Sequence, residues 1–444
     1  MTDPVRLGLT VVTSPLEVGA ADAPALLERL RSAFAQGGVA KLELILAPPS
    51  VDPSSAVSAG RLFHDRRVDA ICVIAASWFE DYLVLDLLEE CDVPIVLWAR
   101  PGMETGSLCG VQQLGFMLKQ LGKPFCFVFD KPGPGISVQR AFEFAKAAAL
   151  RRALRRGRIG YLGHRVEGMT ETTAHELALK KLFGPRVVGV DSQVFLDRVA
   201  RAPAGPAMTH WGQVKATAGR VSSTDASGLL AMQVYVALKE TVAEAGLSAV
   251  AVGCYPHLMG KVCLPISLLA EEGIPIACEG DVNNALSMLM LTFLTGEPVH
   301  NTDLLDPIPA ENSIVFSHCG NGGFSLAPSR DVIHLAPVRL MDSGVCALFP
   351  ARPGPVTLLN IVASMSGYRM ATLFGEAIET DMVFPGNPLR VRFRSDFREI
   401  LAWIAEEGLG HHWMAAYGDV RRPLADLAHM VGASVLGGSL LNME

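Results

Sequence analysis

The chain has 444 residues, of which 50% are hydrophobic and 19% charged, and its formal net charge is −7 at pH 7. This composition excludes a disordered chain and lacks the basic excess of a nucleic-acid-binding protein. The length predicts two to three domains. We find no secretory leader, no run of about 18 apolar residues and no CxxC spacing among the nine cysteines. We therefore expect a cytoplasmic protein without membrane or nucleic-acid partners.

The first third of the chain alternates apolar runs with amphipathic helical patterns. The run AICVIA at residues 70–75 is apolar throughout, as in a strand buried on both faces of a sheet. Such alternation predicts a parallel sheet covered by helices, here in a first α/β domain over residues 1–156. Its expected strands are residues 5–12, 41–47, 70–75, 93–98 and 125–129, and its expected helices are residues 23–36 and 138–156.

A second α/β pattern follows and predicts a second domain over residues 157–305. A long amphipathic helix is expected over residues 225–245, and residues 222–224 are candidates for its N-cap. Because the two α/β patterns are similar in size, we expect two Rossmann-like, doubly wound domains. The other expected elements are strands at residues 158–162, 187–191, 248–252 and 274–277, and helices at residues 171–183 and 282–294.

Proline and glycine become frequent beyond Pro298, and short β-like runs replace the earlier alternation. This change predicts a third, mostly β domain over residues 306–444. The predicted fold class is therefore α/β, with two doubly wound domains followed by a β-rich C-terminal domain. The expected elements of the third domain are strands at residues 313–317, 332–335 and 355–359 and one helix at residues 397–407.

The segment CEGDVNN, residues 278–284, holds the densest group of reactive side chains. A strand delivers Glu279 and Asp281 to its carboxyl end, where open α/β sheets place their ligand sites. Two carboxylates that are two positions apart in an extended segment point the same way. They suit a hard divalent cation such as Mn²⁺ or Mg²⁺, and either can act as a base. The alternative is structural, because Asp281 is also suited to cap the helix that follows it.

Four histidines stand at unusual positions in the sequence. His257 and His318 each follow an expected strand, and His411 and His412 are adjacent. Imidazole is a common metal ligand and a proton shuttle, although a single histidine is more often a hydrogen-bonded structural residue. The glycine-rich CGNGGF at residues 319–324 could bind an anion through backbone N–H groups, or could form a tight turn.

Several of these segments resemble the L-fucose/L-arabinose isomerase family. The most specific is CYPHLMGKVCLPISLLAEEGIPIACEGDVNNALSMLML at residues 254–291, where a strand closes in an E-x-D turn followed by Asn. SHCGNGGFSLA at residues 317–327, PGPVTLLNI at residues 353–361 and GHHWMAAYGD at residues 410–419 are similar to segments of its C-terminal half. The resemblance covers most of the chain from about Arg158 onward.

This resemblance implies two Rossmann-like domains, a β-barrel-like C-terminal domain and assembly as a homo-oligomer. It implies aldose–ketose isomerisation of a sugar with Mn²⁺, or alternatively Mg²⁺, Co²⁺ or Zn²⁺. The cation would hold two adjacent sugar oxygens and stabilise a cis-enediolate, while two acidic groups move a proton between carbons 1 and 2. By position, Asp281 matches the family's acidic metal ligand and base. One residue of the pair His411 and His412 matches its C-terminal histidine ligand.

The remaining candidates complete this expected site. Glu279 is a second ligand or acid–base group. Substrate contacts are expected from four residues near plausible strand ends or in the glycine-rich segment: Trp78, Arg100, His318 and Asn321.

One position departs from the family's pattern. His257 stands where many relatives carry a glutamate that binds the metal and acts as acid and base. A neutral imidazole can bind a metal or carry a proton, but it lacks the negative charge that holds a hard cation. The departure leaves two alternatives open. One is another metal-dependent reaction on the same scaffold, such as epimerisation or a lyase step, and the other is a non-catalytic sugar-binding protein.

Overall fold

The structure is a computed structural model that describes residues 4–39 and 41–436. The chain divides into two compact units. The first contains residues up to 153 together with residues 422–431, and the second contains residues 154–421 and those from 432 onward. The division near residue 154 lies close to the first expected boundary. The second and third expected domains lie together in the second unit, and the boundary expected at residue 305 falls inside a strand, β11 (His300–Ile308).

The first unit is built on a parallel sheet with strand order β2-β1-β3-β4-β5. All six residues of β3 are buried, as its apolar sequence predicts. Helices α2, α3 and α4 cover one face of this sheet, where their buried apolar side chains form a single cluster with those of the strands. The strands are β1 (Val5–Val12), β2 (Leu42–Leu46), β3 (Ala70–Ala75), β4 (Ile95–Ala99) and β5 (Phe125–Phe129). The helices are α1 (Ala23–Gln36), α2 (Pro53–Asp65), α3 (Tyr82–Glu90), α4 (Ser107–Gln120) and α5 (Ile136–Arg156).

A helix from the far end of the chain also belongs to this unit. Helix α13 (Arg421–Val431) buries Leu424 and Leu427. The guanidinium of Arg140 in α5 donates two hydrogen bonds, of 2.5 and 2.6 Å, to the carboxylate of Asp426 in α13. Bidentate, partly buried ion pairs of this kind are among the stronger ionic contacts in proteins. This pair therefore joins two helices that are almost three hundred residues apart in sequence.

The second unit begins with a four-stranded parallel sheet, ordered β10-β9-β6-β7. Its long helix α9 starts as expected, since Thr224 caps it by accepting a hydrogen bond from the Ser227 backbone N–H. The strands are β6 (Arg158–Leu162), β7 (Arg186–Val190), β9 (Ala249–Val252) and β10 (Ile276–Ala277). The helices are α6 (Glu176–Leu182), α7 (Ser192–Arg201), α8 (Ala204–Lys215), α9 (Asp225–Ala245), α10 (Cys263–Glu271) and α11 (Val282–Thr295).

The rest of the second unit is mostly β. Six antiparallel strands follow the order β15-β18-β11-β12-β17-β16, and β16 pairs back with β15, so the sheet closes on itself. Closure removes the exposed sheet edges, as in a barrel. A seventh strand, β19, adds in parallel to β16, and a smaller sheet has the order β14-β13-β8. The strands after β11 are β12 (Ser313–Ser317), β13 (His334–Val338), β14 (Ser343–Leu348), β15 (Gly354–Ser364), β16 (Gly367–Ile378), β17 (Leu389–Arg392), β18 (His412–Tyr417) and β19 (Ser434–Leu436). The remaining elements are β8 (Arg220–Val221) and α12 (Phe397–Glu406).

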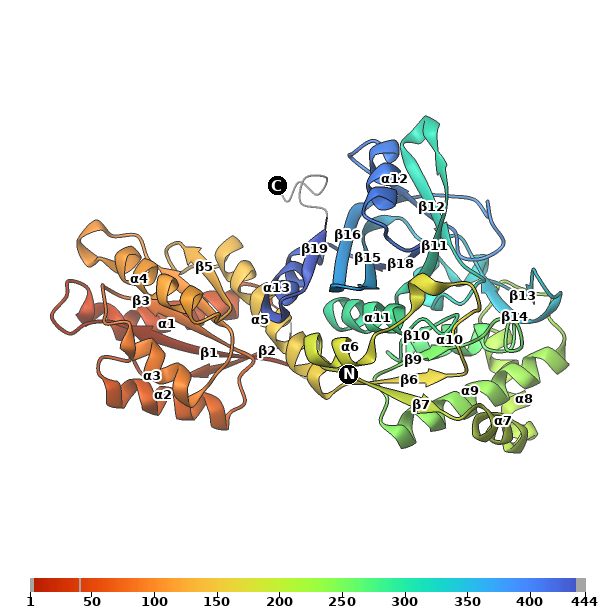
Figure 1. The fold of residues 1–444 in the computed structure, drawn as a ribbon, viewed down its shortest axis with the longest axis horizontal. Coiled ribbons are helices and arrows are strands. Elements are labelled where there is room, and N and C mark those ends of the chain that lie inside the picture. The colour runs from red at the N-terminus through yellow and green to blue at the C-terminus, as the bar shows by residue number, and fades with distance from the viewer. Residues whose placement is uncertain (1–3, 40, 437–444) are drawn as a thin grey trace. The chain divides into compact units, whose positions relative to one another are not determined.

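Helix α11 joins the parallel sheet to the barrel. It packs against β9 on one side and against β15 and β18 on the other. Figure 1 shows it lying between these strands. Ten of its fourteen residues are buried, including the polar Asn283 and Asn284. The segment just before α11 is therefore held where the end of the parallel sheet meets the barrel.

One expected helix differs from the structure. The helix predicted over residues 171–183 is a 3-10 turn at Thr170–Thr172 followed by the shorter α6. The ring of His175 accepts a hydrogen bond from the Ala178 backbone N–H and starts α6 there. The side chain of Thr172 bonds the Met169 carbonyl instead of supporting a continuous helix. Among the described residues, no helix is both long and apolar enough to span a bilayer.

A buried histidine in β11 predicts acid sensitivity of the fold. His300 is 1% exposed, and neither ring nitrogen has a hydrogen-bond partner among the described residues. Burial, helped by the charge of Arg352, lowers the pKa of His300 to about 3 from an ordinary 6.5. On acidification, the unfolded chain binds a proton at His300 before the folded chain does. The free energy of unfolding is therefore unaffected by His300 above about pH 6.5, and it falls by about 1.4 kcal/mol per pH unit as the pH decreases toward 3.

We expect the His300→Leu variant to lose less denaturant resistance than the wild type between pH 7 and pH 5. Equal losses in urea titrations would contradict this assignment.

Candidate functional site

The backbone at Glu279 adopts an unusual conformation. Its φ is +63°, in the left-handed region that costs a non-glycine residue roughly 1–2 kcal/mol. Three contacts hold the turn. The Glu279 N–H donates to the thiol sulfur of Cys254 at 3.4 Å, its carbonyl accepts from the Val166 N–H at 3.3 Å, and the Gly280 N–H donates to the Val252 carbonyl at 2.9 Å. Backbone strain of this kind gathers at functional sites. Here it turns the Glu279 side chain toward the barrel.

Asp281 has both of the roles that its sequence position allows. One carboxylate oxygen accepts from the Asn284 N–H at 3.0 Å and caps α11. The other lies 2.9 Å from Nδ1 of His412. The side chain is almost fully buried. Asp281 therefore caps the helix and also holds the Nδ1 edge of the His412 ring.

Strand register brings three further side chains to the same place. His412 is the first residue of β18, and Asp303 in β11 is its direct cross-strand partner. On the other side of β11, Asp303 pairs with Ser317, the last residue of β12, and His318 follows immediately. Residues opposite one another in an antiparallel pair have neighbouring side chains. The barrel thus carries Asp303, His318 and His412 as one group.

Four side chains converge at this point. The Nε2 atom of His412 lies 3.1 Å from a Glu279 oxygen and 3.4 Å from an oxygen of Asp303. The Nε2 atom of His318 lies 3.9 Å from the other Glu279 oxygen and 3.8 Å from the same Asp303 oxygen. Glu279, His318 and His412 form a group that could hold a metal ion, and so do Asp303, His411 and His412.

The charges of this group stabilise one another. Burial would raise the pKa of Glu279, but the nearby imidazoles of His318 and His412 outweigh it and keep that pKa well below its usual range. Burial also works against a charged His412, yet Asp281 and Glu279 raise its pKa to about 9. Asp303 outweighs burial in the same way and raises the pKa of His318. The Glu279 carboxylate and the two imidazoles therefore stabilise one another's charged forms.

The donor set fits a divalent cation. Two imidazole nitrogens and two carboxylates are ligands accepted by Mn²⁺, Co²⁺ and Zn²⁺. The Asp303 oxygen that faces both rings is buried without a hydrogen-bond partner among the described residues, a cost that a cation would remove. Asp281 holds the far nitrogen of His412, which is how an outer carboxylate orients a metal-bound imidazole.

A small pocket lies beside this group. Its volume is about 10 Å³. At its mouth His411 places Nδ1 2.9 Å from a carboxylate oxygen of Glu171, and both side chains are partly exposed. The pocket is lined by Glu171, Thr172, Asp281, Asn284, Asn360, Ile361, Val362, Gly410, His411 and His412.

The other expected site residues lie elsewhere. His257 is exposed in the loop after β9 and belongs to neither metal-compatible group. The amide of Asn321 is buried and donates to the thiol of Cys278 at 3.0 Å, so it supports the turn behind Glu279. Trp78 and Arg100 belong to the first unit, where Trp78 donates to Gln113 and Arg100 pairs with Asp22.

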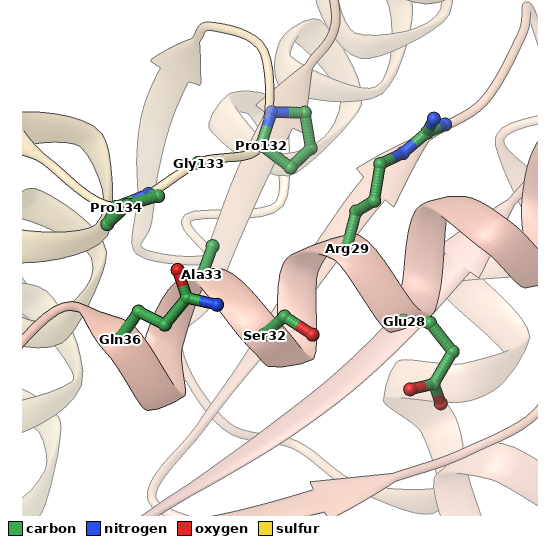
Figure 2. A pocket seen from close by; sticks show the side chains of 8 residues that line it. All are labelled: Glu28, Arg29, Ser32, Ala33, Gln36, Pro132, Gly133 and Pro134. Atoms are coloured by element: carbon green, nitrogen blue, oxygen red, sulfur yellow. The ribbon is translucent and has the colours of Figure 1, made fainter.

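The first unit has a larger but open pocket of about 260 Å³ (Figure 2). Figure 2 shows its two walls, the side of α1 that carries Ser32 and Gln36 and the loop from Pro132 to Pro134. Its lining contains no histidine and only one carboxylate, Glu28. Both metal-compatible groups found among the described residues lie in the second unit.

The curated proteins that are similar to the chain include three relatives, each named a sulfoquinovose isomerase. The chain is 25% identical to that of Alkalicoccus urumqiensis over 382 residues, covering 83% of this chain and 86% of that protein. It is 25% identical to that of Priestia aryabhattai over 408 residues, covering 87% and 90%. It is 25% identical to that of Clostridium sp. (strain MSTE9) over 353 residues, covering 76% and 79%. The similarity therefore spans both units.

Two other comparisons add little. No family model matches the chain. An ABC transporter solute-binding protein from Burkholderia multivorans covers 67% of this chain and 95% of its own at 14% identity, but its TM-score of 0.21 supports no argument.

The converging donors predict which residues hold a metal. We expect Asp303→Asn and His318→Gln to weaken the binding of added Mn²⁺, since each removes one donor from this group of four side chains. Asp306→Asn is the matched control, because it makes the same chemical change in the same strand at an exposed position. Elemental analysis and titration calorimetry with Mn²⁺ check this. Unchanged metal binding in Asp303→Asn would remove the site from this position.

Proposed function

We propose that this chain is a metal-dependent aldose–ketose isomerase that acts on a sulfonated sugar such as sulfoquinovose. Two observations support the proposal. The relatives that match over most of the chain are named sulfoquinovose isomerases. In addition, Glu279, His318 and His412 meet at the junction of the parallel sheet and the barrel with a spacing suited to a cation. This convergence is the observation that carries the proposal.

Four side chains would hold the ion: Glu279, Asp303, His318 and His412. When bound, a divalent cation supplies positive charge that polarises the carbonyl and hydroxyl oxygens on two adjacent sugar carbons. The set expected from the sequence was Asp281, His257, His411 and His412. In this proposal only His412 remains a ligand, and Asp281 acts through His412. By accepting the Nδ1 proton, Asp281 leaves Nε2 free as a donor atom on the side of Glu279 and Asp303.

The pair of His411 and Glu171 provides acid–base chemistry next to these donors. A ring nitrogen of His411 lies within 4.8 Å of donor atoms of His412 and Asp303. If Nδ1 of His411 donates to Glu171, its other nitrogen carries a lone pair and can accept a proton. His411 would take the proton from carbon 2 of the aldose and return it to carbon 1. A second proton would pass from the hydroxyl on carbon 2 to the oxygen on carbon 1, which balances the conversion to a ketose.

Isomerisation of sulfoquinovose, followed by NMR in the presence of Mn²⁺, tests the proposal. We expect turnover by the wild type and by Asp306→Asn. Asp303→Asn should lose both metal and activity. A wild type that binds the sugar without turnover would contradict the isomerase assignment and favour a binding protein.

A separate variant tests the proton transfer. We expect His411→Gln to keep its metal but to lose activity by about 10²–10⁴-fold, the usual contribution of one acid–base group. In D₂O the wild type should incorporate deuterium at carbon 1 of the ketose, because His411 is partly exposed and exchanges its proton. Full activity with normal deuterium incorporation in His411→Gln would assign the proton transfer to another group.

A further inference from the structure

We propose that the small pocket between Asn284 and Asn360 is a subsite for a single sugar hydroxyl group. This inference rests on the proposed function and concerns which part of the sugar enters the site. The two asparagines belong to different elements, α11 and β15, and both line the pocket beside Asp281 and His412. Each is only 2% exposed.

Each asparagine has one polar atom without a partner among the described residues. These atoms are the side-chain nitrogen Nδ2 of Asn284 and the side-chain oxygen Oδ1 of Asn360. Buried polar groups are nearly always hydrogen-bonded in native proteins, and leaving one unpaired is costly. A polar lining with two unpaired groups therefore indicates an occupant that satisfies them.

The orientation of the Asn360 amide is fixed by its surroundings. Its nitrogen donates to the carbonyl of Gly410 at 3.1 Å and to that of His412 at 2.6 Å. Carbonyl oxygens only accept, so the amide cannot be turned around to place its oxygen there. The unpaired atom of Asn360 is therefore an acceptor. The same two bonds join Asn360 to His412 and to Gly410 just before it, so the segment that carries His412 also fixes one wall of the pocket.

The unpaired atoms define the chemistry of the occupant. Asn284 offers a donor and Asn360 offers an acceptor. A hydroxyl group satisfies both, because its oxygen accepts while its proton donates. A sulfonate oxygen only accepts and would face the Asn360 oxygen without a proton to give. The pocket volume of about 10 Å³ also corresponds to a single water-sized group. A hydroxyl fits this space and a sulfonate does not, so the sulfonate end of the sugar must lie outside it.

Deoxy substrates test the subsite. We would measure kcat/KM for sulfoquinovose and for analogues that lack one hydroxyl at a time, with the wild type, Asn284→Asp and Asn360→Leu. In the wild type one analogue should react slower by about tenfold or more, because it leaves both amides unpaired. In Asn284→Asp, which keeps the shape but replaces the donor by an acceptor, we expect the parent and that analogue to react at similar rates.

Matched controls separate this role from a general disturbance of the site. Asn283→Asp changes the neighbouring buried residue, which does not line the pocket, and should keep the wild-type preference between parent and analogue. Metal content and far-ultraviolet circular dichroism should be unchanged in Asn284→Asp, since Asn284 is no ligand. Asn360→Leu, if it keeps its metal, should also lose the preference.

The outcomes distinguish this inference from the proposed function. An active wild type whose preference survives in both variants overturns the subsite and assigns the pocket to a structural water. A wild type that turns over none of the sugars overturns the proposed function, and the subsite with it. A preference lost in Asn283→Asp as well as in Asn284→Asp would also overturn the subsite, because the effect would not depend on the pocket lining.

Discussion

The imidazole of His412, held between carboxylates on both sides, is the contact on which the rest of the site depends. Its Nδ1 faces Asp281 at 2.9 Å and its Nε2 faces Glu279 at 3.1 Å. Glu279 and Asp281 belong to the turn that ends the parallel sheet, whereas His412 belongs to the barrel. The ring therefore connects two sheets within one unit. A displacement of either sheet would separate a nearly buried ring from the groups that compensate for its burial.

Electrostatics explains why these residues depend on one another. An isolated buried carboxylate or imidazolium loses its hydration, and only close partners of opposite charge make up for the loss. Here three carboxylates surround two imidazoles, with Asp303 between His318 and His412. Removing any one of them leaves a neighbour uncompensated. The left-handed backbone at Glu279 adds a further cost that structural stability alone does not require, which is typical of a turn shaped by function.

Part of this arrangement could be predicted from the sequence. The strands at residues 5–12 and 70–75 and the helix at residues 225–245 have the expected bounds, because they are continuous apolar runs or strongly periodic segments. Glu279, Asp281 and His412 stood out because they follow strand ends or occur in unusual pairs. Several helices of the first unit and the barrel strand β16 were not predicted, since their patterns are weaker and their pairing is long-range.

Asp303 and Glu171 show why the rest of the site was not found. Asp303 lies in HNTDLLDPI, where two aspartates and a proline are typical of a loop, yet the segment is strand β11. Only its register with β18 places Asp303 opposite His412, and register is a tertiary property. Glu171 was expected inside a helix, whereas it lies in the short turn before α6 that brings it to His411.

The register that places Asp303 beside His412 also matters for residue 257, where this chain departs from the family's pattern. The resemblance implies a glutamate there, so its replacement by histidine leaves the expected site one negative charge short. In the structure Glu279 and Asp303 are both within 3.4 Å of His412, and Asp281 holds its other nitrogen. Three carboxylates thus lie against the His412 ring without any contribution from residue 257, which is exposed in a loop. The charge needed to hold a hard cation is present, supplied in part by a barrel strand. The histidine at 257 is therefore no argument against metal chemistry in this chain.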